Sequence, residues 1–148
     1  MDQQIVADND ATRASLQSLI RTLADHDFAR DLGDGWTVST ALAHLAFWDR
    51  RGKLLLERWQ AGDVAPADMP EWYSDTLNNT LVDEWRAIPP HDAARLAIEA
   101  AVAIDAAIAG LEDRVTAEIM ARDEAWRLTR SKHRREHIEQ IERCLARN

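Results

Sequence analysis

Apolar residues recur every three or four positions along most of the chain, and this spacing predicts amphipathic helices. We expect a first helix over residues 3–25, ended by the break at Asp31–Gly35. Thr37 or Ser39 can cap a second helix that runs to about Gln60. The apolar positions that define these two helices are Ile5, Val6, Leu16, Leu19, Ile20, Leu23, Leu42, Leu45, Trp48, Leu55 and Leu56.

The middle of the chain predicts a loop, a short helix and a long helix. Residues 61–70 contain two prolines and a glycine and predict the loop, and a shorter helix is expected over residues 72–86. Pro89 and Pro90 interrupt the chain and then suit the first turn of a new helix. That helix is expected over residues 91–110, which are rich in alanine and therefore favour helix.

A last helix is expected to end at Leu145 and to begin at about Asp123 or at Ser131. No segment alternates between apolar and polar residues in the manner of a β-strand. Together these elements predict an all-α fold, a four-helix bundle with one longer, partly helical crossover. At this length we expect one domain, residues 1–148.

Composition and charge narrow the set of partners and compartments. The 26 acidic and 18 basic residues give a formal net charge of −8, so we expect no nucleic-acid partner and no anionic membrane surface. No apolar run approaches the ~20 residues of a transmembrane helix. The acidic N-terminus lacks the apolar core of a signal peptide, so a cytoplasmic location is expected. Cys144 is the only cysteine, which excludes an intrachain disulfide, and we expect it to be buried as a small apolar residue.

Candidate chemistry first appears on the last predicted helix. His133 and His137 are four residues apart, so they project from one face, one turn apart. That face continues to Ile141 and Leu145, which indicates an inward setting where an unpaired imidazole is costly. The charges expected at the surface of this helix are Arg134, Arg135, Glu139 and Glu142. A histidine pair with this spacing is also common on a solvated helix face, so the pair alone is a weak signal.

A third histidine on the second predicted helix strengthens the case for a metal. His44 is flanked on its own helical face by Ala41 and Trp48, again an inward setting. Taken alone it would be a hydrogen-bonded core histidine. Three inward histidines with coordination positions left open are the arrangement of a catalytic metal site rather than of a closed structural one. Nickel and zinc both suit nitrogen ligands.

Two segments resemble the signatures of the DinB-like (YfiT-like) superfamily. GWTVSTALAHLAFWDRR, Gly35–Arg51, is similar to its second-helix signature, and SKHRREHIEQIE, Ser131–Glu142, is similar to its fourth-helix signature. The order and separation of the segments agree with the superfamily along nearly the whole chain. The resemblance implies a four-helix bundle of up-down-down-up course, often a homodimer, with a divalent metal held by His44, His133 and His137.

Within that superfamily the sequence is most similar to the branch of mycothiol-dependent maleylpyruvate isomerase. The resemblance implies a metal-dependent enzyme that uses a low-molecular-weight thiol such as mycothiol. In some members one fourth-helix ligand is a glutamate, where this chain has His133. The C-terminal extension of the isomerase itself is missing here, so its specific substrate is not carried over. The leading hypothesis is a thiol transferase or isomerase acting on a small-molecule electrophile.

Two residues beside the histidines are candidates for catalysis, each with a plainer alternative. Arg130 can hold a substrate carboxylate or reach past the helix end into solvent. Glu136 can orient His133 or act as a base, or it is an ordinary surface glutamate. Asp49 has no assignable role. The tryptophans that either line a pocket above the metal or belong to the core are Trp48, Trp72, Trp85 and Trp126.

Two other functions compete with the enzyme hypothesis. One is a resistance protein that binds or hydrolyses a drug or toxin, since some DinB-like relatives do so without a metal. The other is a non-catalytic bundle in which the metal only holds the helices together. His26 and His91 fall at loop or cap positions and need no function.

Overall fold

The computed structural model describes residues 2–63, 65–66 and 69–147. Helix accounts for 78% of the structure, so the all-α prediction is confirmed. The elements in chain order are α1 (Gln3–Thr22), the 3₁₀ helix η1 (Asp25–Ala29), β1 (Asp31–Gly33), β2 (Trp36–Thr37), α2 (Val38–Gln60), α3 (Glu71–Arg86), α4 (Pro90–Ala109), α5 (Asp113–Ala121), the 3₁₀ helix η2 (Ala125–Arg127) and α6 (Ser131–Leu145). No helix in the described ranges is both long and apolar enough to cross a bilayer.

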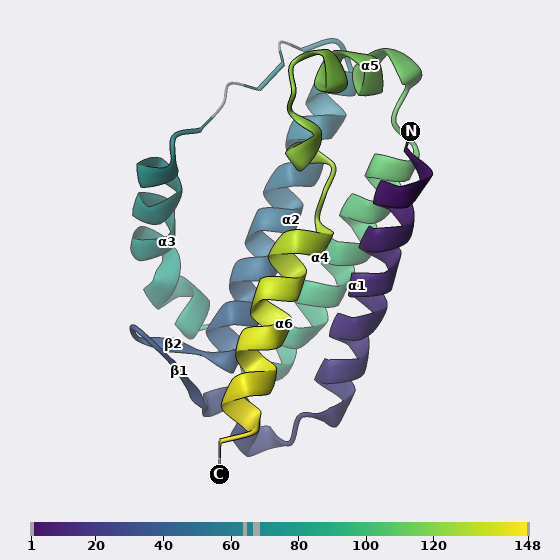
Figure 1. The fold of residues 1–148 in the computed structure, drawn as a ribbon. Coiled ribbons are helices and arrows are strands. Elements are labelled where there is room, and N and C mark those ends of the chain that lie inside the picture. Colours follow the sequence, from purple (N-terminus) through teal and green to yellow (C-terminus); the bar gives the residue numbers. More distant parts are fainter. Residues whose placement is uncertain (1, 64, 67–68, 148) are drawn as a thin grey trace.

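The long helices α1, α2, α4 and α6 lie side by side, and α3 stands apart beside α2 (Figure 1). α2 packs along α4, while α1 packs on both α4 and α6. α2 and α4 run away from the end that carries the two strands, and α1 and α6 run toward it (Figure 1). α3 lies in the connection between α2 and α4 and packs on α2, on the side away from α1 (Figure 1).

The predicted ends of the first two helices agree with the structure except at one position. α2 begins after Thr37, whose hydroxyl accepts a hydrogen bond from the amide of Thr40 at 3.2 Å, as expected of a cap. α1 ends at Thr22 and not at Asp25, because Leu23 is in an extended conformation and a 3₁₀ helix follows.

A short antiparallel hairpin, β1 and β2, corrects the expectation that the chain has no strands. Its turn has positive φ at Gly33 (99°), Asp34 (53°) and Gly35 (77°). Glycine adopts such angles at little steric cost, and aspartate tolerates the left-handed region better than most residues. The paired segments span three and two residues, too few for an alternating pattern to be recognised.

The connection after α4 also contains structure that was not predicted. α5 and η2 occupy residues where we expected either no element or an earlier start of the last helix. Val115 and Ile119 of α5 are fully buried in a cluster with Trp59 and Ile104. A helix of nine residues spans too few turns to give a clear periodic signal, and packing against α2 and α4 stabilises it.

Arg134 is the centre of a buried ion-pair network, although it was expected among the surface charges. Its side chain is 0% exposed and donates to Asp49 at 3.0 Å and to Asp105 at 2.8 and 2.9 Å. Arg130 adds a second cation on Asp49 at 2.8 Å, and Arg13 adds one on Asp105 at 2.7 Å. A guanidinium is tolerated in the interior only when it is paired, so this network fixes α1, α2, α4 and α6 relative to one another.

The start of α6 is capped from another helix. The Oδ1 atom of Asn9 on α1 accepts hydrogen bonds from the amides of Arg130 and Ser131, each at 2.9 Å. Its Nδ2 atom donates to the carbonyl of Leu128 at 2.8 Å. Of the two starts that the sequence allowed, Asp123 and Ser131, the structure has Ser131, because this distant cap is not visible to local capping rules.

Candidate metal centre

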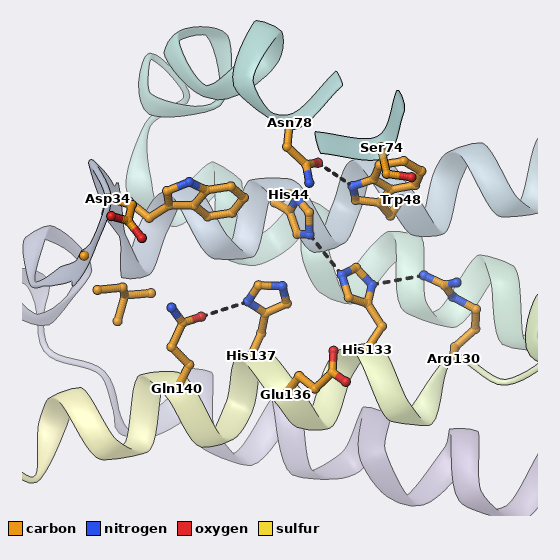
Figure 2. Close-up of a pocket in the computed structure, with 13 residues that line it drawn as sticks. Asp34, His44, Trp48, Ser74, Asn78, Arg130, His133, Glu136, His137 and Gln140 are labelled. Atoms are coloured by element: carbon orange, nitrogen blue, oxygen red, sulfur yellow. Dashed lines mark hydrogen bonds between the residues drawn. The ribbon is translucent and has the colours of Figure 1, made fainter. Parts of the chain in front are cut away.

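The three histidines singled out in the sequence come together between α2 and α6 (Figure 2). His44 projects from α2, and His133 and His137 project from successive turns of α6. The Nε2 atoms of His44 and His133 are 2.9 Å apart, and one ring nitrogen from each of the three histidines lies within 4.8 Å of the other two. The three imidazoles therefore face one shared point.

The nitrogen spacing fits a single first-row metal ion. Two nitrogens bound to one ion at about 2.0–2.1 Å lie about 2.8–3.4 Å apart for bond angles between about 90° and 109°. The 2.9 Å between His44 and His133 falls in this range, and the ring of His137 is 4.9 Å from that of His44 between centroids. Three neutral nitrogens that converge from two rigid helices form a donor set that zinc and nickel accept.

Burial holds the three histidines in the neutral form that binds metals. It lowers the pKa of His44 to about 3, with further contributions from the charges of His137 and Arg130. Burial, followed by the charge of Arg130, lowers the pKa of His133 well below its usual value. Burial is also the main cause of the lowered pKa of His137. At neutral pH all three rings are uncharged, so their lone pairs are available.

Partners outside the cluster orient the two histidines of α6. The Nδ1 atom of His137 is 3.1 Å from Oε1 of Gln140, one turn further along α6. An amide oxygen only accepts, so Nδ1 of His137 carries the proton and Nε2 is left free to bind a metal. This is the usual arrangement around a metal-binding histidine, in which the second nitrogen donates to a fixed acceptor.

The second histidine, His133, has a different partner. Nη2 of Arg130 is 3.3 Å from Nδ1 of His133, and a guanidinium only donates. With Nδ1 as acceptor, the proton of His133 is on Nε2 and points to Nε2 of His44. The proton of His44 is then on Nδ1, which is buried and has no partner at hydrogen-bond geometry in the described part of the chain, although Asn78 lies near enough to raise the pKa of this ring slightly against the effect of burial. A buried N–H without a partner costs about 1–3 kcal/mol. An ion bound to Nε2 of His44 would leave this Nδ1–H as it is, so the cost is the same with or without an ion.

Arg130 is itself fixed by Asp49. Its Nε atom donates to Oδ1 of Asp49 at 2.8 Å, and its side chain is only 14% exposed. The alternative in which Arg130 extends past the helix end into solvent is therefore wrong. Asp49, for which the sequence suggested no role, is 1% exposed and joins the centre to the Arg134 network.

The histidines line a pocket of about 560 Å³ that opens between α2, α3, α6 and the hairpin. Trp36 is stacked on His137 with 10° between the rings, and Trp48 donates from Nε1 to Oδ1 of Asn78 at 3.0 Å. Glu136 lines the pocket but is exposed, so both interpretations of this residue stay open. The lining residues are Leu32, Gly33, Asp34, Trp36, His44, Trp48, Ser74, Asn78, Arg130, His133, Glu136, His137 and Gln140 (Figure 2).

The other tryptophans divide between the core and the surface. Trp85 is 4% exposed and meets the ring of His44 edge-on, with 5.1 Å between centroids. Trp72 and Trp126 are 66% and 52% exposed and do not line this pocket. Trp36 was not among the candidates, because it precedes the second helix and gives no helical periodicity.

Two predictions on residues outside the centre have different outcomes. Cys144 is half-buried rather than fully buried, with its Sγ atom 3.4 Å from the carbonyl oxygen of Asp31. His91 lies at the surface, 3.1 Å from a carboxylate oxygen of Asp25, so it stays outside the cluster as expected. His26 is also exposed, beside Asp27.

A known family matches most of the chain. The family described as mycothiol maleylpyruvate isomerase N-terminal domain matches residues 10–136. The match includes His44 and His133 and ends one residue before His137. No curated protein and no solved structure matches the chain.

Proposed function

Because the chain belongs to the mycothiol maleylpyruvate isomerase N-terminal domain family, a DinB-like family, we propose that it is a metal-dependent thiol transferase or isomerase. The metal is a divalent ion, nickel or zinc, held by His44, His133 and His137. The thiol is a low-molecular-weight one such as mycothiol, and the substrate is a small electrophile. The family supports the thiol, and the histidine cluster supports the metal.

The proposal rests on the histidine cluster at the wall of the pocket. One buried imidazole from α2 and two half-buried ones from α6, all neutral, present nitrogens within 4.8 Å of one another at the wall of a pocket of about 560 Å³. A structural metal site has four protein ligands and is closed, whereas this one has three and faces open space. The pocket has room for a thiol and a small second substrate beside the histidines.

The residues of the pocket support thiol chemistry. A bound divalent metal lowers the pKa of a coordinated thiol, so that the nucleophilic thiolate is present at neutral pH. Glu136, one turn from His133 on the pocket side of α6, can accept the proton that the thiol loses. In transfer, sulfur bonds to the electrophilic carbon while the leaving group departs with its electron pair. In isomerisation, sulfur adds to a conjugated double bond, the resulting single bond rotates, and the same sulfur leaves.

Arg130 and Gln140 act as positioning residues in this proposal. Gln140 holds the ring of His137 with Nε2 toward the shared point. A metal on Nε2 of His133 requires the proton of that ring to be on Nδ1, so Arg130 would then be held by Asp49 alone. Arg130 would present its remaining donors to the pocket, where a substrate anion can accept them.

The four long helices fit the bundle of the superfamily. α1 runs opposite to α2, α4 runs parallel to α2, and α6 runs opposite to α4 (Figure 1). This order corresponds to an up-down-down-up course with α3 in the crossover. Assembly as a homodimer and a cytoplasmic location stay predictions.

A conjugation assay tests the function. The purified protein is loaded with zinc or nickel and mixed with mycothiol and monochlorobimane, whose chloride is a leaving group and whose thioether product is fluorescent. We expect a metal-dependent rate in the wild type that falls to the uncatalysed rate in His137→Ala. His91→Ala is the matched control, because His91 is an exposed histidine outside the cluster, and it should keep the wild-type rate.

The assay also separates the competing functions. Equal rates for metal-loaded wild type, metal-free wild type and His137→Ala would contradict a metal-dependent transferase. A protein that binds the metal, loses stability when the metal is removed and shows no thiol chemistry with this or other electrophiles would be a metal-stabilised bundle without catalysis. A protein that binds a toxic natural product without metal would be a resistance protein.

A further inference from the structure

Arg51 on α2 has an incomplete set of partners. Its side chain is half-buried, its guanidinium lies over the ring of Trp48 at 5.5 Å from the centroid, and Nη2 is 3.8 Å from Sδ of Met69. A thioether sulfur is a weak acceptor. In residues 2–63, 65–66 and 69–147, no carboxylate lies within ion-pair distance of Arg51. Among these residues, its strong donors therefore have no anionic acceptor.

The neighbouring arginines differ from Arg51 in this respect. Arg127 donates to Glu124 at 2.8 Å, and Arg130 donates to Asp49 at 2.8 Å. Burial, followed by the charge of Arg127, lowers the pKa of Arg51, which is the direction expected for a cation without a counter-ion. An anion bound to Arg51 would offset the cost of burying its positive charge.

Arg51 lines a cavity of about 140 Å³ that adjoins the pocket of the histidines. The two spaces share Trp48, Ser74 and Arg130 as lining residues. None of the described residues that line the smaller cavity is acidic, and three of them are arginines. The remaining lining is largely apolar, so the cavity suits a single anionic group on an apolar stem.

The spacing along α2 sets the length of a molecule that would reach both the histidine cluster and Arg51. His44, Trp48 and Arg51 are at positions i, i+4 and i+7 and therefore lie on one face of the helix. Seven residues of α-helix correspond to a rise of roughly 10 Å. Trp48 lies between the two ends and contacts both, His44 edge-on and Arg51 across its face.

We propose that Arg51 binds the carboxylate of the electrophile, in a subsite one tryptophan away from the histidine cluster. The bound molecule is a small organic acid whose carboxylate is several bonds from its reacting carbon. A guanidinium can bind a carboxylate through two parallel hydrogen bonds, and no described carboxylate occupies the donors of Arg51. That the acid is a substrate rests on the proposed function, whereas the existence of the subsite does not.

Binding of a simple acid to the metal-free protein tests the subsite. The probe is hexanoate, which has one carboxylate on an apolar chain, and hexanamide is its uncharged counterpart. We expect the wild type to bind hexanoate at least tenfold more tightly than hexanamide by calorimetric titration. Arg51→Gln should weaken hexanoate binding at least tenfold, Arg51→Lys should weaken it less, and the amide should be little affected.

Arg50→Gln is the matched control. Arg50 is adjacent, exposed and of the same charge, so its removal changes the net charge equally and should alter hexanoate binding less than twofold. Equal loss in Arg50→Gln and Arg51→Gln, equal binding of hexanoate and hexanamide, or undiminished binding in Arg51→Gln would each overturn the proposal. If Arg51→Gln does not fold, the side-chain Nε–H signal of Arg51 in the wild type decides, since it must shift on addition of hexanoate.

A kinetic comparison connects the subsite to the reaction. In metal-loaded protein, Arg51→Gln should raise KM for a carboxylate-bearing electrophile at least tenfold and change kcat less than twofold, with no such effect for an uncharged electrophile. If the histidines bind no metal, the proposed function fails while the hexanoate result stands. If hexanoate binding does not depend on Arg51, the subsite fails while the metal centre stands.

Discussion

Replacing Arg134 with alanine is expected to destabilise the protein strongly. The guanidinium is fully buried and makes four hydrogen bonds of 2.8–3.2 Å to the carboxylates of Asp49 and Asp105. It also donates to the backbone carbonyls of Asn9 at 3.3 Å and Ala101 at 3.4 Å. Removing one member of such a network leaves its partners buried without full compensation, which costs about 3–5 kcal/mol.

The structure places the expected value at the lower end of that range. Asp49 keeps Arg130 at 2.8 Å, and Asp105 keeps Arg13 at 2.7 Å, so neither carboxylate loses its last cation. We therefore expect a loss of about 3 kcal/mol in the free energy of unfolding. For a domain of this size that corresponds to a decrease in Tm of about 6–12 °C.

Urea denaturation followed by circular dichroism measures the effect. Arg135→Ala is the matched control, because Arg135 is the adjacent residue on α6 and is exposed. It should change the free energy of unfolding by less than about 0.5 kcal/mol. A loss in Arg134→Ala of less than 1 kcal/mol beyond that of Arg135→Ala would refute the view that this network holds the four long helices together.

Three further predictions follow from the centre and its supports. In the metal-free folded protein the pKa of His44 is about 3, whereas in the unfolded chain it is 6.5. Below pH 6.5 the unfolded chain therefore takes up a proton at His44 that the folded chain does not. The free energy of unfolding falls as a result, by about 2 kcal/mol at pH 5 from this residue. Urea titrations at pH 7 and pH 5 should show this loss in the wild type and in His91→Gln and a smaller one in His44→Phe; equal losses in all three would count against it. Asn9→Ala should lower the free energy of unfolding by about 1–2 kcal/mol, because the first turn of α6 loses its cap, whereas Asp10→Ala beside it should have a smaller effect. Gln140→Leu should weaken zinc binding about 10-fold or more in a competition titration, because His137 loses the acceptor that orients it, and unchanged affinity would show that Gln140 plays no such part.

The helices and the histidine cluster could be predicted from the sequence because their signals are local and periodic. Three- and four-residue spacing of apolar residues identified the long helices, and the four-residue step from His133 to His137 placed both rings on one face. The inward setting of His44 followed from the same reasoning, since Ala41 and Trp48 flank it on its helical face.

The surroundings of the cluster could not be predicted because they depend on contacts between distant segments. Arg134 looks like a surface charge in the sequence, and only the approach of Asp49 and Asp105 from other helices makes its burial favourable. Asn9 caps a helix that begins more than a hundred residues later, so no local rule could identify it. Trp36 reaches the centre through a hairpin too short to give a strand pattern.

Metal content measured on the purified protein shows whether His44, His133 and His137 bind an ion. Wild type, His137→Ala and His91→Ala are each incubated with equal nickel or zinc, freed of unbound ion and analysed for bound metal per chain. We expect about one equivalent in the wild type and in His91→Ala, and a large loss in His137→Ala. A wild type that retains no metal, or a His137→Ala protein that retains as much as the wild type, would contradict it.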